Sequence, residues 1–145
     1  MKNIKDYIIT EPTPALEVGR RVCELVREEP KRMRMGHFFC TNPRDYGYPN
    51  PPRCNTIGCI AGWIGFVSGD GDIMECAADL FFDKGTEGNR ELKAGFFGGK
   101  HFILEDGSPK QAEAAALFLE RIMKTYKDEL SHRIIHPITK ENRIR

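Results

Sequence analysis

The stretch that decides the fold is Cys54-Asn-Thr-Ile-Gly-Cys59-Ile-Ala-Gly-Trp63-Ile-Gly-Phe-Val-Ser-Gly69. Asn55 or Thr56 can cap a helix that runs through this stretch. Its apolar residues surround the helix axis, which is typical of a helix that is buried on all sides. Each glycine costs a helix roughly 1 kcal/mol relative to alanine, so we expect another backbone to approach closely and compensate. The stretch therefore predicts a central, glycine-rich, buried helix over residues 56 to 68.

Two amphipathic helices are predicted to cover this central helix. The first begins at Thr13, a hydroxyl N-cap followed by Pro14 at the first helical position, and ends before Pro30. Its apolar residues recur at helical spacing, and they are Val18, Val22, Leu25 and Val26. The second helix begins with the capping box Ser108-Pro-Lys-Gln111. Its apolar face consists of Ala115, Phe118, Leu119, Ile122, Met123 and Tyr126.

Shorter elements complete the predicted fold. We expect helices over residues 72 to 82 and 89 to 97, the latter ended by Gly98-Gly99. The residues from His101 to Leu104 are expected to form a short extended piece before a turn at Asp106-Gly107. The predicted fold class is therefore mainly α, a single compact helical domain with at most one or two short strands.

Two segments fit no regular element. Residues 36 to 55 contain prolines and glycines that deny them helical or ladder hydrogen bonds, so we predict one long Pro-rich loop. Such long loops in a compact domain tend to be functional or to be held by something. Residues 131 to 145 are basic and contain Pro137, which predicts a loosely attached tail. The expected organisation is one domain over residues 1 to 130, followed by this tail.

Composition and charge exclude several classes of function. Lys and Arg number 22 against 21 Asp and Glu, so the net charge of +1 gives no global field to attract nucleic acid or an anionic membrane. The N-terminus lacks the apolar region of a signal peptide, and the apolar stretch over residues 57 to 67 is too short for a bilayer. We therefore expect a cytoplasmic protein whose five cysteines are thiols or metal ligands rather than disulfides.

Two structural interpretations of Cys54 and Cys59 compete. In the first, both are small hydrophobic residues that pack at the start of the buried helix. In the second, His37, Cys40, Cys54 and Cys59 bind a structural zinc ion. One imidazole and three thiolates suffice for a closed tetrahedral site, which would pin the long loop to the helix. The four residues between Cys54 and Cys59 make a wider spacing than the common zinc knuckle, so this motif is only moderately specific.

In a third interpretation Cys59 is a catalytic nucleophile. With Thr56 as the N-cap, Cys59 lies in the first helical turn, where unpaired amides and the helix dipole lower the pKa of a thiol. His101 would act as the general base, with Asp106 or Glu105 orienting it, in the layout of papain-like cysteine hydrolases. Such enzymes carry the base on an extensive sheet, which this sequence does not predict.

The cysteine segment resembles a motif of a group of small uncharacterised proteins found in bacteria and their phages. That motif runs Met-Gly-x-Trp/Phe, a variable loop, and then Cys-Gly-Thr-x-x-Cys-x-Ala-Gly-Trp/His. Its counterparts here are Met35-Gly-His-Phe38 and the residues from Cys54 to Trp63, with Asn55 where glycine is usual. No activity is established for the group, and Cys40 and His101 have no counterpart in its motif. The resemblance implies that the paired cysteines belong to the fold.

The predicted function follows by elimination. The sequence contains neither a P-loop nor a dinucleotide-binding glycine motif, and no strand is predicted before the central helix to support a phosphate cradle. We therefore expect a non-enzymatic intracellular binding or regulatory protein, encoded by a phage or prophage, that acts through a protein partner. Neither nucleic acid nor a membrane is expected as a partner, and zinc is the one cofactor considered.

Overall fold

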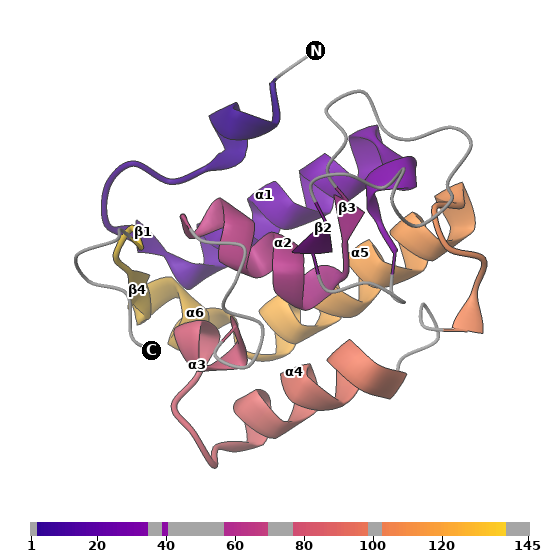
Figure 1. Ribbon diagram of the computed structural model, residues 1–145. Helices are drawn as coiled ribbons and strands as arrows, with labels where there is room; N and C mark the ends of the chain where they lie inside the picture. Colours follow the sequence, from indigo (N-terminus) through magenta and orange to yellow (C-terminus); the bar gives the residue numbers. More distant parts are fainter. Residues whose placement is uncertain (1–2, 35–38, 41–56, 70–76, 99–102, 139–145) are drawn as a thin grey trace.

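Two long helices, α1 (Ala15–Glu28) and α5 (Pro109–Thr125), lie side by side along the length of the structure (Figure 1). The computed structural model describes residues 3–34, 39–40, 57–69, 77–98 and 103–138. Gly19 allows the close approach, because a Cβ atom there would lie 2.5 Å from Sδ of Met123. The apolar stripe predicted for α1 is buried, and so is the face predicted for α5 except for Phe118 and Tyr126, which are partly buried. The two helices provide the floor on which the other elements pack.

The central helix, α2 (Ile60–Val67), packs across α1 and is the buried centre that the sequence predicts (Figure 1). Every residue of α2 except Phe66 is buried. The helix begins later than expected, because Ile57–Gly58 form the short strand β3, which pairs antiparallel with β2 (Phe39–Cys40). Cys59 then has an extended backbone, with φ −84° and ψ 177°, and serves as the N-cap residue. A strand therefore does precede the central helix, contrary to the prediction.

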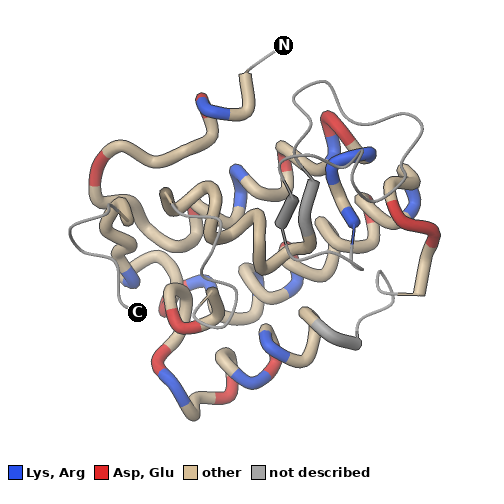
Figure 2. The backbone as a smooth tube through the Cα atoms, in the orientation of Figure 1, with Lys and Arg blue, Asp and Glu red and all other residues tan. Residues whose placement is uncertain are grey.

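Smaller helices surround this centre. Their bounds are η1 (Ile4–Tyr7), η2 (Pro30–Arg32), α3 (Ala77–Phe81), α4 (Glu87–Gly98) and α6 (Lys127–His132). The predicted helix over residues 89 to 97 is confirmed as α4, which lies beside α5. The predicted start of α3, at residue 72, lies outside the described residues. Lys and Arg are interspersed with Asp and Glu over the helices, as Figure 2 shows, which agrees with the balanced charge of the sequence.

The start of α1 differs from the prediction. Thr13–Pro14 form strand β1, which pairs antiparallel with β4 (Ile134–Ile135), and Pro14 becomes the N-cap residue. The Thr13 hydroxyl donates a hydrogen bond to the carbonyl oxygen of Glu11 (2.7 Å) and caps nothing. The described residues thus hold four strands of two residues each, more than the one or two expected, within a mainly α domain.

The C-terminal segment is attached to the domain as far as residue 138. Ile135 is buried, and Ala15 N–H donates to the carbonyl oxygen of Arg133 at 2.7 Å. Ile138 N–H donates to the carbonyl oxygen of Ser68 at 2.8 Å, directly after α2. The predicted loose tail is therefore wrong for residues 131 to 138, because the apolar isoleucines outweigh the basic composition.

The start of α5 follows the predicted cap in part. The Ser108 hydroxyl accepts from Gln111 N–H at 3.1 Å, but the Gln111 side-chain oxygen accepts from Gly107 N–H instead of from the cap residue. The predicted turn at Asp106-Gly107 is present, with Gly107 at φ 78°. Ile103 and Leu104 precede it in a 3-10 turn and a bend rather than in the expected strand. None of the helices described here is both long and apolar enough to cross a membrane.

Candidate functional site

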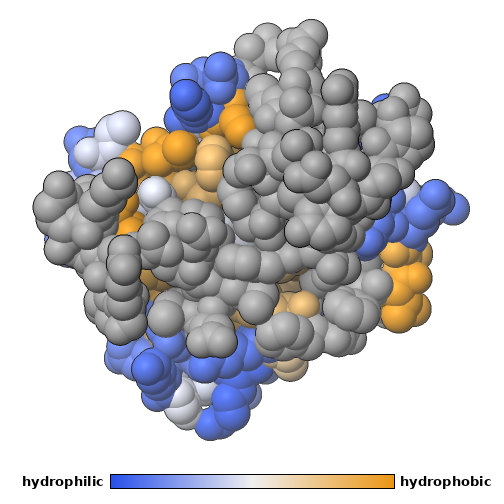
Figure 3. All heavy atoms as spheres, viewed as in Figure 1, coloured by the Kyte–Doolittle hydropathy of each residue, from blue (hydrophilic) through white to orange (hydrophobic). Residues whose placement is uncertain are grey.

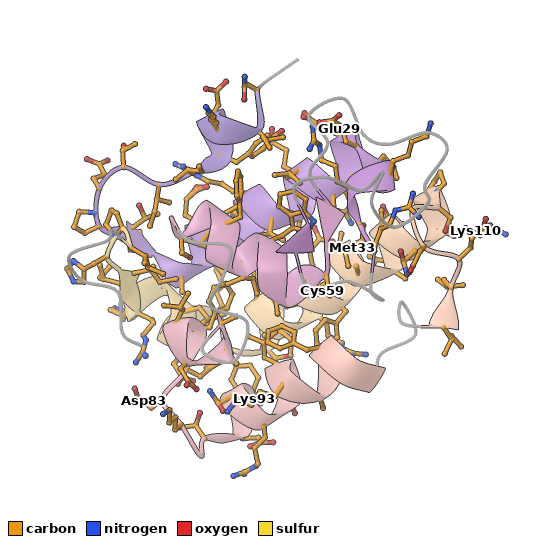
Figure 4. The ribbon with its side chains drawn as sticks, viewed as in Figure 1. Glu29, Met33, Cys59, Asp83, Lys93 and Lys110 are labelled. Carbon is orange, nitrogen blue, oxygen red and sulfur yellow. The ribbon has the colours of Figure 1, made fainter. Side chains whose placement is uncertain are left out.

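Cys59 lies in the middle of the molecule, at the N-cap of α2. Figure 4 shows it next to Met33 in the interior, whereas Glu29 and Lys110 lie at the edge. The Cys59 residue is 5% exposed, and its burial raises the pKa of the thiol above the ordinary value. The amides of Gly62 and Ala61, in the first turn of the helix, lower the pKa, but burial outweighs them. The lowered thiol pKa expected for a nucleophile is therefore wrong.

Asp106, one of the predicted catalytic residues, helps to hold the start of α5. Its Oδ1 accepts from Nε2 of Gln111 at 2.8 Å, and its carbonyl oxygen accepts from a guanidinium nitrogen of Arg34 at 3.3 Å. The other predicted catalytic partner, His101, lies outside the described residues. The structure therefore gives Asp106 a structural environment and brings no histidine to it among the described residues.

The predicted zinc ligands are described in part. His37 and Cys54 lie outside the described residues, and for Cys40 only the backbone is described. The register of β2 and β3 pairs Cys40 with Ile57, two residues before Cys59. Cys59 itself follows β3 as the N-cap residue of α2 and is not part of this ladder. No cluster of three His, Cys, Asp or Glu side chains suited to a metal occurs within the part of the chain that the structure describes.

A groove between α1 and α5 is the site that the sequence did not predict. Its volume is about 400 Å³, and it is lined by Arg20, Cys23, Glu24, Arg27, Glu28, Glu120 and Met123. The two sulfur-containing residues form its apolar floor and are 4% and 7% exposed. Burial, the largest cause, raises the pKa of the Cys23 thiol to about 12, and its Sγ donates to the carbonyl oxygen of Ala116 at 3.6 Å. The floor is thus closely packed and carries no ionised thiol.

Paired charges form the rim of this groove. Arg27 reaches from α1 to two carboxylates of α5, with nitrogen–oxygen distances of 2.9 Å to Glu113 and 2.7 Å to Glu120. Hydrogen bonds from Arg27 lower the pKa of both carboxyl groups. The Tyr7 hydroxyl donates a hydrogen bond to Glu28, another residue of the groove. The pKa of Tyr7 is raised, chiefly by burial. Arg27, Glu113 and Glu120 therefore stay charged near neutral pH.

Leu117 places an exposed apolar side chain beside the groove. It is 54% exposed and lies between Glu113 and Glu120 along α5, four residues after the first and three before the second. The sequence carried a signal for it, because Leu117 falls outside the apolar face predicted for this helix. Ile103, 84% exposed, is a second such residue, and Figure 3 shows hydrophobic surface at the edge where Figure 1 places the segment leading into α5.

Comparisons with known proteins identify no relative. No protein-family model, no curated protein and no solved structure matches this chain. The resemblance at residues 54 to 63 therefore stays a prediction, and function has to be argued from the residues and their geometry.

Proposed function

We propose that this protein is a non-enzymatic binding protein that docks a protein partner on the face formed by α1 and α5. The observation that carries the proposal is the groove, with Cys23 and Met123 at its floor, charges on its rim and Leu117 exposed beside it. Protein interfaces combine an apolar centre with a polar rim in this way. A cytoplasmic, phage- or prophage-related regulatory role belongs to the same proposal and is supported by the motif resemblance and the charge balance.

The geometry at Cys59 favours packing over catalysis. A nucleophilic thiol has to be reached by its substrate and has to lose its proton at working pH. Cys59 is 5% exposed, and burial raises its pKa. Both observations favour the interpretation of this cysteine as a small hydrophobic residue. The α1–α5 face, by contrast, offers surface that a partner can reach.

The test of this proposal compares two exposed apolar residues. Tagged protein is expressed in the native host, and its crosslinked partners are identified and quantified by mass spectrometry. We expect Leu117→Gln to reduce capture of the main partner by about tenfold, because an anchor at the centre of an interface carries much of the binding energy. Ile103→Gln makes the same chemical change at a residue 84% exposed elsewhere and should leave capture unchanged.

The fold and the cysteine are controlled in the same experiment. Circular dichroism and thermal unfolding should match the parent protein for both glutamine variants, and capture should survive Cys59→Ser when that variant is folded. The proposal is wrong if Leu117→Gln leaves the captured set unchanged, or if both glutamine variants lower capture equally. Either result would remove the α1–α5 face as the docking surface.

A structural zinc site is a second candidate, independent of the groove. The register of β2 and β3 supports it, because the backbone of Cys40 pairs with Ile57, two residues before Cys59. Such a site would hold the long loop to the helix and would stabilise the fold instead of performing chemistry.

Elemental analysis tests the zinc candidate. Protein prepared without chelators should contain about one equivalent of zinc, and fewer than about 0.2 equivalents would end the proposal. Cys40→Ser and Cys59→Ser should each lower the zinc content. Cys23→Ser, at a buried thiol on the α1–α5 groove, should leave it unchanged.

A further inference from the structure

Resting on the proposed function, we infer that the partner presents a cationic amphipathic segment to the α1–α5 face. Such a segment carries an apolar side chain flanked by Lys or Arg. The inference concerns the chemistry of the partner, and it rests on the charges around the groove and on the apolar groups between them.

The charges around the groove are unbalanced toward the negative. The groove lining holds three carboxylates, from Glu24, Glu28 and Glu120, against two guanidinium groups, from Arg20 and Arg27, and Glu113 adds a fourth carboxylate through its ion pair with Arg27. The local formal charge is therefore −2, whereas the whole chain has +1. Arg27 divides its one positive charge between two carboxylates of α5. A cationic segment therefore gains favourable interactions at this face.

The α1–α5 face also offers apolar groups that a partner can contact. Met123 and Cys23 form the floor, and methionine adapts its shape to different apolar side chains. Leu117 is exposed on α5, four residues after Glu113 and three before Glu120, the two carboxylates that bind Arg27. An apolar side chain of the partner can therefore contact the floor or Leu117 while neighbouring cations reach the rim. Lysine and arginine suit this arrangement, because their aliphatic stems cover apolar surface.

The shape of the face favours an elongated segment. The groove follows the line between two long neighbouring helices, and its lining runs along α1 from Arg20 to Glu28. An amphipathic helix laid in such a groove places its apolar side chains at regular helical intervals along the floor. The occupant that fits shape, charge and apolar content together is a basic, amphipathic stretch of another protein.

Synthetic peptides of opposite charge test the inference on the full-length protein. One peptide of about 15 residues is built from leucine, alanine and lysine, a length at which isolated helices begin to be stable. Its counterpart carries glutamate in place of every lysine. Fluorescence anisotropy gives the dissociation constant of each peptide. We expect the cationic peptide to bind at least about tenfold more tightly than the anionic one.

Matched variants separate the groove from general charge attraction. Leu117→Gln and the double variant Glu24→Gln/Glu120→Gln should each weaken the cationic peptide by about fivefold or more. Their controls are Ile103→Gln and the double variant Glu105→Gln/Glu129→Gln, which make the same changes on exposed positions elsewhere. These controls should bind the peptide as the parent protein does.

The outcomes distinguish this inference from the proposed function. If the parent protein and all variants bind the cationic peptide equally, the peptide is held by general charge attraction and not by the groove. This result would overturn the inference. If neither peptide binds while host capture still depends on Leu117, the function stands and the partner chemistry is wrong. If capture also fails, both are wrong. Self-association that Leu117→Gln abolishes would make a second copy the occupant and would likewise overturn the inference.

Discussion

The start of α2 is buried in the interior, whereas the outer face of α1 and α5 is accessible. The chemically distinctive residues gather around α2, where Cys59, Trp63 and the glycines are buried. The α1–α5 face presents glutamates, arginines and one leucine that a partner can reach, around a buried floor of Cys23 and Met123. An unusual sequence segment therefore marks a demanding packing problem here, whereas the accessible chemistry lies on an ordinary helical surface.

The largest effect is expected at Trp63. Its side chain is fully buried, its Nε1 donates to the carbonyl oxygen of Arg32 at 3.2 Å, and it packs edge-on against Phe66 with ring centroids 5.3 Å apart. Trp63→Ala should lower the free energy of unfolding by about 3–5 kcal/mol, measured by urea denaturation with circular dichroism. Trp63→Phe keeps most of the ring and loses the hydrogen bond, so a smaller loss is expected. A loss below about 1 kcal/mol for the alanine variant would contradict the central role of α2.

A second, smaller effect is expected at the other end of α2. Gly69 has φ 116°, and a Cβ atom there would lie 2.5 Å from the carbonyl oxygen of Ile138. Gly69→Ala should therefore cost about 2–3 kcal/mol, from backbone strain and from the clash with the C-terminal segment.

Gly85 provides the matched control for this substitution. It also has a positive φ, 81°, but a Cβ atom there meets nothing within 4 Å. Gly85→Ala should cost only the strain, about 1 kcal/mol. Equal losses at Gly85 and Gly69 in thermal unfolding would mean that the segment around Ile138 does not press on α2.

The periodic parts of this fold were predictable from the sequence. The stripes of α1 and α5, the buried character of α2 and the Ser108 cap all depend on residues close together in the chain. The Thr13 cap was wrong because β4, more than a hundred residues away, pairs with Thr13–Pro14. The prediction of helix at residues 57 and 58 was wrong for the same kind of reason, because these residues pair with Phe39–Cys40. Long-range pairing overrode the local preference in both cases.

The α1–α5 groove could be predicted only in part. Leu117 stands outside the apolar stripe of its helix, which is visible in the sequence alone. The pairing of Arg27 with Glu113 and Glu120 depends instead on the register of two helices that are distant in the chain. Gly19 lies against the Met123 side chain at this contact between the helices, and no local pattern indicates this.

A third prediction concerns the reactivity of Cys59. Because burial raises its pKa and leaves it 5% exposed, iodoacetamide should alkylate it at least about tenfold more slowly in the folded protein than in urea. Peptide mapping by mass spectrometry separates this cysteine from the other four. Rapid alkylation of the folded protein at pH 6 would instead support an activated thiol. It would reverse the contrast between the buried segment and the accessible face.

The smallest effect is expected on the α1–α5 face, at Glu120. Its side chain is 42% exposed, so Glu120→Gln should lower the free energy of unfolding by no more than about 1 kcal/mol near pH 7. Hydrogen bonds from Arg27 lower the pKa of Glu120 in the folded protein. The contribution of this carboxylate is therefore present above its unfolded pKa of about 4.3 and is lost as the pH falls through the folded value.

The pH dependence separates this ion pair from the packing around Trp63. Urea denaturation of the parent and Glu120→Gln proteins should show a difference near pH 7 that shrinks toward zero in acid and also in high salt, which screens exposed charges. The loss caused by Trp63→Phe should stay nearly constant over the same range, because neither the ring nor its hydrogen bond to Arg32 titrates. If the Glu120 difference persisted unchanged below pH 3, the pairing with Arg27 would contribute nothing through charge. The rim would then be held by helix packing alone.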